Sequence, residues 1–191
     1  ALLVREHREH GLSFAGITTF NLDEYTGLPA ASPDTYRSYM HERFFRHIDI
    51  NPANTHLPDG NAPDLDAECA AYEERIAAAG GIDLQLLGIG AVGHIGFNEP
   101  LSALRSRTRV KALSPKTIEQ NAAAFGGDPK RVPRRAITMG VGTILDSRRV
   151  LLLATGADKA GIIAKAVEGP VTSMISATAL QLHPRCTVIV D

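Results

Sequence analysis

A chain of 191 residues, 44% of them apolar, can bury one sizeable core, so we expect a single domain over residues 1–191. Lysine and arginine total 20 while aspartate and glutamate total 21, a balance that argues against nucleic acid or an anionic membrane as partner. There is no run of the roughly 18 apolar residues that a spanning helix needs, and the charged first residues do not resemble a signal peptide. Two cysteines far apart, Cys69 and Cys186, fit a protein of the reducing cytoplasm.

The chain begins with a helical pattern. Leu2, Leu3 and Val4 run into charged residues that end at Gly11, which is typical of the end of a helix. We interpret this pattern as the tail of a helix cut from its upstream partner, and expect a segment to be missing before residue 1.

Short apolar runs then alternate with helical patterns, which predicts an α/β fold with an open, mostly parallel sheet and helices on both faces. The predicted strands cover residues 16–22, 83–89, 108–113, 136–139, 150–154 and 187–190, and the predicted helices cover residues 33–47, 63–79, 114–125 and 157–167. Ligands bind beyond the carboxyl ends of such strands, so the loops after Leu22, Ile89 and Ala154 should converge.

Two adjacent carboxylates, Asp23 and Glu24, follow the first predicted strand. Paired acids at a strand end suit a general base or a metal site, but aspartate also favours turns by bonding to the backbone. All three interpretations stay open on these residues alone.

A glycine-rich loop follows the strand predicted at 83–89, with His94 five residues before Glu99. A carboxylate can orient and charge an imidazole, and the resulting pair can transfer protons near neutral pH. The glycines favour this interpretation slightly because they let the backbone approach a ligand closely. The alternative is a loop histidine whose nitrogens are satisfied by backbone, with Glu99 exposed to solvent.

Lys159 stands in the first turn of the helix predicted at 157–167. A cation there opposes the helix dipole, and an anionic ligand such as a phosphate would explain its position. The alternative is an ordinary solvated lysine, which is the commoner case.

Four cations, Arg105, Arg107, Arg109 and Lys111, are spaced by two residues. On one strand they would share a face and repel one another unless an anion or an acidic partner offset them. Only Arg109 and Lys111 lie within the predicted strand. A second anion site, a subunit contact and a solvated edge strand remain open interpretations.

Several motifs together resemble the glucosamine-6-phosphate deaminase family in order and spacing over nearly the whole chain. They include TFNLDEYTGLP at 19–29, GHIGFNEP at 93–100 and LLLATGADKA at 151–160. The related 6-phosphogluconolactonases share the general fold and a similar histidine loop, but the first two motifs are closer to the deaminases.

This resemblance implies conversion of glucosamine 6-phosphate and water to fructose 6-phosphate and ammonia, with no metal or organic cofactor. It implies that Asp23 is the base that moves a proton between C2 and C1. His94 would exchange a proton with the ring oxygen and the anomeric hydroxyl, and Glu99 would orient and tune that histidine. Lys159 would bind the substrate phosphate.

The resemblance also bears on regulation. Ser102, Arg109 and Lys111 match positions that bind an allosteric amino-sugar phosphate between subunits in regulated hexameric members. The resemblance therefore implies a homo-oligomer, such as the hexamer of the regulated members, and a second ligand that is also an amino-sugar phosphate.

Three departures from the family pattern stand out. Val92 occupies a position usually held by aspartate or asparagine, so polar support for His94 is lost from that side. Ala123 replaces an arginine that closes on the substrate phosphate in many members. The family's glycine-rich phosphate loop is expected to lie before residue 1.

These departures leave two alternatives to an active deaminase. One is a phosphosugar-binding homologue with impaired catalysis. The other is a different phosphosugar isomerase or lactonase built on the same fold.

Overall fold

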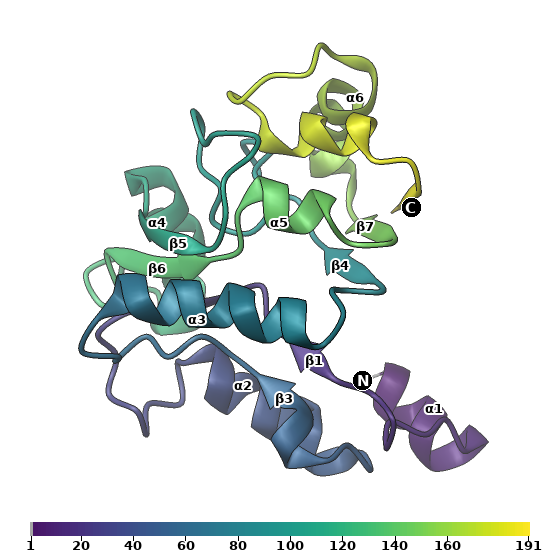
Figure 1. The fold of residues 1–191 in the computed structure, drawn as a ribbon. Coiled ribbons are helices and arrows are strands. Elements are labelled where there is room, and N and C mark those ends of the chain that lie inside the picture. The colour runs from purple at the N-terminus through teal and green to yellow at the C-terminus, as the bar shows by residue number, and fades with distance from the viewer. Residues whose placement is uncertain (1) are drawn as a thin grey trace.

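The computed structural model describes residues 2–191 as layered helices and strands (Figure 1). Its helices are α1 (Leu2–His10), α2 (Tyr36–Arg43), α3 (Leu65–Ala78), α4 (Pro115–Asn121), α5 (Val141–Leu145) and α6 (Ala160–Glu168), with the 3-10 segments η1 (Phe45–His47), η2 (Pro52–Asn54), η3 (Ala122–Phe125), η4 (Ala157–Lys159) and η5 (Ser176–Leu182). Its strands are β1 (Thr19–Phe20), β2 (Asp23–Tyr25), β3 (Thr55–His56), β4 (Gln85–Leu87), β5 (Arg109–Ala112), β6 (Arg135–Thr138), β7 (Val150–Ala154) and β8 (Cys186–Val190). None of the helices in the described part of the chain is long and apolar enough to cross a membrane.

The strands form three small sheets. Two are parallel, with the orders β4-β7-β8 and β1-β3, and these agree with the predicted α/β class. The third has the order β2-β6-β5 and is antiparallel. The strands predicted at 108–113 and 136–139 therefore exist but pair with each other in a separate sheet, where the second of them also pairs with β2. That strand was not predicted, because its residues, Asp23–Tyr25, are too few and too polar to form a strand pattern.

Helix α3 shows how the sequence determines a local element. Asp64 accepts hydrogen bonds from the backbone N–H groups of Asp66 and Ala67, which satisfies two donors at the exposed helix start. Tyr72 and Ile76, four residues apart, are buried on one face of the helix. The Tyr72 hydroxyl also donates to the Asn21 carbonyl at 2.8 Å, and so joins this helix to the end of β1.

One face of the β4-β7-β8 sheet carries the main core. Its inward residues Leu87, Val150 and Leu152 pack with side chains from α3, α5, α6 and η5. On the opposite face, Leu86, Leu153 and Ile189 are 51%, 40% and 50% exposed. The apolar runs predicted a sheet covered on both faces. In residues 2–191, however, the helices cover only the inward face.

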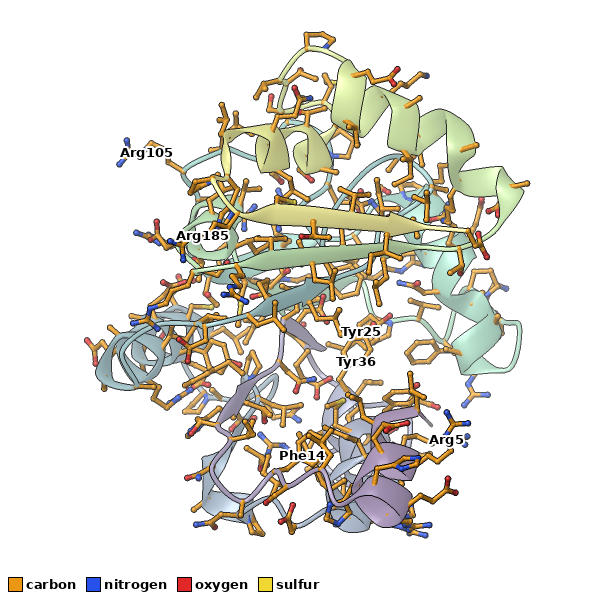
Figure 2. The ribbon with its side chains drawn as sticks, turned by 90° about the vertical axis from the view of Figure 1, so that its right-hand side faces the viewer. Arg5, Phe14, Tyr25, Tyr36, Arg105 and Arg185 are labelled. Atoms are coloured by element: carbon orange, nitrogen blue, oxygen red, sulfur yellow. The ribbon has the colours of Figure 1, made fainter. Side chains whose placement is uncertain are left out.

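A second core lies under the antiparallel sheet. Tyr25, on β2, stacks on Tyr36 of α2 with ring centroids 5.3 Å apart, and the two rings lie together in Figure 2. Phe97 and Phe125 pack on the same tyrosine, at 5.5 and 5.3 Å. This aromatic cluster fixes the strand that begins at Asp23.

The partly buried carboxylate of Glu73 joins three elements. It accepts hydrogen bonds from the Thr108 N–H at 2.7 Å, the Thr108 hydroxyl at 2.5 Å and the Thr143 hydroxyl at 2.6 Å. Helix α3 is thus bonded both to the residue before β5 and to α5.

We expect Glu73→Ala to lower the free energy of unfolding by about 2–3 kcal/mol, because three donors lose a charged acceptor. Urea denaturation followed by circular dichroism measures this change. Exposed Glu74 is the matched control on the same helix, and Glu74→Ala should stay within about 0.5 kcal/mol of the parent chain. Equal losses in the two variants would contradict the role given to Glu73.

Candidate active site

The loops that follow β1, β4 and β7 meet, as the sequence predicted. Thr138 of β6 is the ladder partner of Asp23, and its hydroxyl accepts a hydrogen bond from the Phe97 N–H at 3.1 Å. A Cβ placed on Gly93 would lie 2.9 Å from the Cδ1 of Ile162 in α6, so this loop also presses on the helix that follows Lys159. The 90–99 loop is therefore in contact with both of its predicted neighbours.

Asp23 is partly buried at the start of β2. Burial, together with the negative charge of neighbouring Glu24, raises the pKa of its carboxyl to about 7. A carboxyl with a pKa near neutrality accepts and returns a proton readily at physiological pH.

Glu24 has a structural role instead. Its buried carboxylate accepts hydrogen bonds from the backbone N–H groups of Tyr36 at 3.0 Å and Arg37 at 2.9 Å, the first two residues of α2. A third bond comes from the N–H of Tyr25 at 2.9 Å. A carboxylate at a helix N-terminus satisfies exposed donors and complements the helix dipole. The two adjacent acids therefore have separate tasks.

The His94 ring packs directly against Gly90. A Cβ placed on Gly90 would lie 2.2 Å from the Nε2 of His94, so a side chain there would displace the imidazole. The Gly90 N–H also donates to the His94 carbonyl at 2.9 Å. Glycine at position 90 is thus required by a close approach within the protein itself.

Buried Glu99 faces the histidine. Its Oε2 lies 3.8 Å from the Nδ1 of His94, within ion-pair range but too far for a hydrogen bond, while its Oε1 accepts from the Ser114 N–H at 3.0 Å. Neither Nδ1 nor Oε2 has a hydrogen-bond partner within residues 2–191. Burial lowers the pKa of His94, the Glu99 charge raises it, and the Lys159 charge lowers it.

Lys159 ends η4 and directly precedes α6. Gly156, three residues earlier, has a φ of 95°, which turns the chain sharply after β7. The lysine is partly buried at the N-terminal end of α6, where the helix dipole and the ammonium group both favour an anion.

Two of the three departures from the family pattern are single residues, and they occupy different environments. Val92 is partly buried in the 90–99 loop, two residues before His94, and supplies no hydrogen bond from its side chain. Ala123 lies exposed in η3. Neither side chain can bind a phosphate or support an imidazole.

The residues predicted for a second anion site lie on different segments of the chain. Ser102 is buried just beyond the 90–99 loop, where its N–H donates to the Glu99 carbonyl at 3.1 Å. Arg109 and Lys111 lie two residues apart on β5, whereas Arg105 projects from the surface (Figure 2) and Arg107 pairs with Asp146. Burial lowers the pKa of Arg109. Arg109 and Lys111 are thus the two cations of this row that share a strand.

Sequence reasoning missed three polar side chains that hold these loops: Asn98, Thr138 and Ser176. Asn98 lies inside the GHIGFNEP motif and could have been suspected. Thr138 lies in the strand predicted at 136–139, where nothing marks its hydroxyl, and Ser176 lies in no predicted element.

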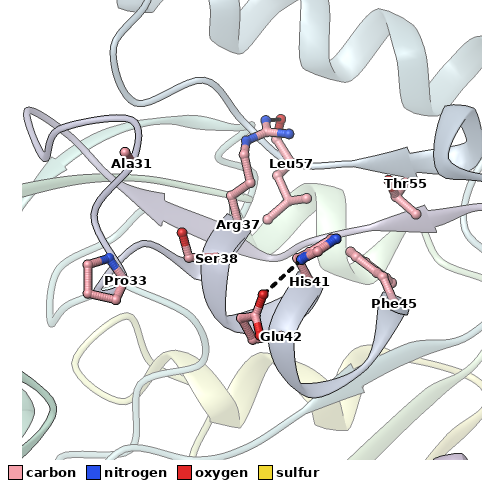
Figure 3. A pocket seen from close by; sticks show the side chains of 9 residues that line it. All are labelled: Ala31, Pro33, Arg37, Ser38, His41, Glu42, Phe45, Thr55 and Leu57. Carbon is pink, nitrogen blue, oxygen red and sulfur yellow. Dashed lines mark hydrogen bonds and ion pairs between the residues drawn. The ribbon is translucent and has the colours of Figure 1, made fainter. Parts of the chain in front are cut away.

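A large hollow of about 540 Å³ lies elsewhere, beside α2 and β3 (Figure 3). Its lining includes Arg37, His41, Glu42, Phe45 and Leu57. None of the predicted site residues lines it. We therefore place the candidate site at the three loops, because they carry the acid–base residues. No cluster of three or more histidine, cysteine, aspartate or glutamate side chains that could hold a metal occurs among the described residues.

Asp23, His94 and Lys159 lie in the segments that follow β1, β4 and β7, and the carboxyl ends of parallel strands are where α/β enzymes bind their ligands. The model of the family described as glucosamine-6-phosphate isomerases/6-phosphogluconolactonase matches residues 1–188, and the chain belongs to this family.

Relatives with known names are similar over almost the whole chain. Glucosamine-6-phosphate deaminase 2 of Mus musculus is 53% identical, with coverage of 99% of this chain and 68% of the relative. Glucosamine-6-phosphate deaminase 1 of Bos taurus is also 53% identical, and the chain spans 65% of its length. Glucosamine-6-phosphate deaminase 2 of Bacillus subtilis is 51% identical, with 76% of the relative covered.

Solved structures agree with this placement. A structure described as a monomeric glucosamine-6-phosphate deaminase superposes with a TM-score of 0.96 at 47% identity, covering all of this chain and 78% of that one. A 6-phosphogluconolactonase from Thermotoga maritima superposes with a TM-score of 0.71 at 22% identity, covering 94% of this chain and 74% of the other. The second similarity concerns the fold alone.

We expect Asp23→Asn to remove a pH dependence of stability. The folded pKa of about 7 lies above the unfolded value of 3.8, so between these values the folded state holds a proton that the unfolded state has released. Stability from this group is therefore full below pH 4 and is lost by pH 8. The variant should match the parent at pH 4 and exceed it by roughly 2–4 kcal/mol at pH 8.

Urea denaturation of the two proteins at both pH values measures this difference. The variant-minus-parent comparison cancels the titration of other groups. An asparagine variant that is equally destabilised at both pH values would show that the Asp23 carboxyl is not held in its neutral form.

We expect two substitutions to move the pKa of His94 in opposite directions. Glu99→Gln removes a negative charge and should lower it, whereas Lys159→Met removes a positive charge and should raise it. NMR titration of the His94 ring proton, assigned with a His94→Gln variant, measures both shifts. An unchanged pKa in the Lys159 variant would place that ammonium away from the imidazole.

Proposed function

We propose that this chain, as one catalytic unit over residues 1–191, converts glucosamine 6-phosphate and water to fructose 6-phosphate and ammonia. The observation that carries the proposal is Asp23, a carboxyl with a pKa near 7 beside the loop of His94 and Glu99. Relatives named glucosamine-6-phosphate deaminase, at 51–54% identity, support the choice of reaction.

The proposed reaction has three proton-transfer stages. His94 first moves a proton to the ring oxygen as the sugar opens. The Asp23 carboxylate then takes the proton from C2 and delivers it to C1, while the ammonium group loses a proton and the C1 oxygen gains one, which turns the aldose amine into a ketose imine. Water adds to the C2 carbon of that imine, and ammonia leaves to give the ketone. A carboxyl with a pKa near the working pH suits a step in which the same proton is taken and returned.

Glu99 and Lys159 support these stages in different ways. The Glu99 carboxylate lies 3.8 Å from the imidazole and stabilises its protonated form. Lys159, at the start of α6, would bind the substrate phosphate together with the helix dipole.

A second candidate function rests on Val92 and Ala123. Val92 stands where the family pattern has a polar residue that supports His94. Ala123 stands where many members have an arginine that closes on the substrate phosphate. A phosphosugar-binding protein with little turnover would have this combination. A different isomerase or a lactonase of the same fold is less well supported, because the similarity to two solved lactonases is only 22% and 21% in sequence and concerns the fold alone.

Regulation and assembly belong to the same proposal. Ser102, Arg109 and Lys111 would form part of a second site for an amino-sugar phosphate, at a contact between copies of the chain in a homo-oligomer. A cytoplasmic location would suit both the substrate and the two free cysteines.

Release of fructose 6-phosphate and ammonia from glucosamine 6-phosphate tests this proposal. We expect Asp23→Asn to lower turnover by about 10³-fold, within the range of general acid–base catalysis. Val92→Asp should raise turnover by roughly 10-fold, because it restores a polar neighbour to the histidine. Turnover should also rise with pH through about 7, where Asp23 becomes the active carboxylate.

Asp66→Asn, on the exposed first turn of α3, is the matched control and should leave turnover unchanged. Binding of the phosphosugar without turnover, in the parent chain and in every variant, would support the second candidate function and end the first.

A further inference from the structure

The loop that carries His94 is hydrogen-bonded to Ser176, a residue that takes no part in the proposed chemistry. The hydroxyl of Ser176, the first residue of η5, accepts from the Ile95 N–H at 3.3 Å and donates to the Asn98 carbonyl at 2.8 Å. Ser176 is 1% exposed, and Asn98 is fully buried. One hydroxyl therefore satisfies two buried backbone groups that flank the turn between residues 95 and 98.

A main-chain bond holds the other side of the histidine. The Ala177 N–H donates to the Gly93 carbonyl at 3.0 Å. Gly93 has a φ of 81°, and a Cβ there would lie 2.5 Å from the side chain of Ile175, so the contact with the residue directly before η5 is tight. The residues immediately before and after His94 are thus both bonded to the same segment.

Asn98 links the same loop by hydrogen bonds to the segment that leads into Asp23, the proposed base. Its side-chain amide donates to the Ile95 carbonyl and to the Met139 carbonyl, both at 2.9 Å. The Met139 N–H in turn donates to the Leu22 carbonyl at 2.8 Å, directly before Asp23. A continuous chain of hydrogen bonds therefore runs from Ser176 through Asn98 to the residue before Asp23.

We propose that Ser176 is a positioning residue, whose hydroxyl fixes His94 relative to Glu99 and to the strand of Asp23. The importance of this role for catalysis rests on the proposed function, whereas the positioning itself does not. A hydroxyl suits this place because it donates and accepts at once. Alanine would leave the Ile95 N–H and the Asn98 carbonyl without this partner, whereas threonine would keep the hydroxyl.

The first test measures hydrogen exchange and the pKa of His94 in the loop, and it does not depend on turnover. In Ser176→Ala we expect hydrogen exchange at the Ile95 amide to speed up by at least ~10-fold, because the amide loses its acceptor. The pKa of His94 should rise by about half a unit or more as water reaches the ring, with Glu99 and Lys159 still facing it. Ser176→Thr should stay close to the parent in both measurements.

Ser147 provides a matched control. It is also a buried serine, and its hydroxyl donates to the Ile144 carbonyl at 2.7 Å, but it lies before β7 at the end of the strand opposite the loops. Ser147→Ala should lower the Tm while leaving Ile95 exchange and the His94 pKa unchanged. A purely structural role for Ser176 would give this same pattern in Ser176→Ala and would overturn the proposal.

Turnover gives the second test. We expect Ser176→Ala to lower kcat by about 10-fold with KM changed less than about 3-fold, and threonine to restore kcat. A folded threonine variant that restores neither kcat nor the His94 pKa would overturn the role given to the hydroxyl. If the parent chain itself shows no turnover, the proposed function fails, and the exchange and pKa measurements still decide the positioning role.

Discussion

The hydrogen bond from the Phe97 N–H to the Thr138 hydroxyl joins the two halves of the candidate site. Thr138 lies beside Asp23 in the antiparallel ladder, and Phe97 lies in the loop that carries His94. The bond is buried, so moving the two segments apart would leave the Phe97 N–H and the Thr138 hydroxyl buried without a hydrogen-bond partner. Asp23 and His94 are therefore held in position relative to each other by a hydrogen bond between two of their neighbours, Phe97 and Thr138.

Neighbouring residues in this site have opposite effects on the folded state. Asp23 is held where its charge is disfavoured, which costs stability at neutral pH, while Glu24 satisfies the start of α2 and stabilises it. The aromatic cluster around Tyr25 keeps the strand rigid enough to hold the disfavoured carboxyl in place. A stable scaffold supporting an unfavourable functional group is a common arrangement in enzymes.

Much of this organisation could be predicted from local sequence. Helix α3 and strand β7 have clear periodicity, and glycines with polar residues indicated the loops of His94 and Lys159. The antiparallel sheet could not be predicted, because its shortest strand, Asp23–Tyr25, resembles a turn. The bonds of Ser176 were also beyond prediction, since they join residues about 80 positions apart and leave no periodic pattern. The roles of the predicted site residues remain predictions.

The open face of the β4-β7-β8 sheet has a practical consequence for anyone who handles this chain. Leu86, Leu153 and Ile189 present apolar surface to water in the native state. A fluorescent dye that reports exposed apolar surface would therefore bind before any unfolding, and a melting curve recorded with it would start from a bright baseline. Circular dichroism, which responds to the backbone, separates surface adsorption from true loss of structure.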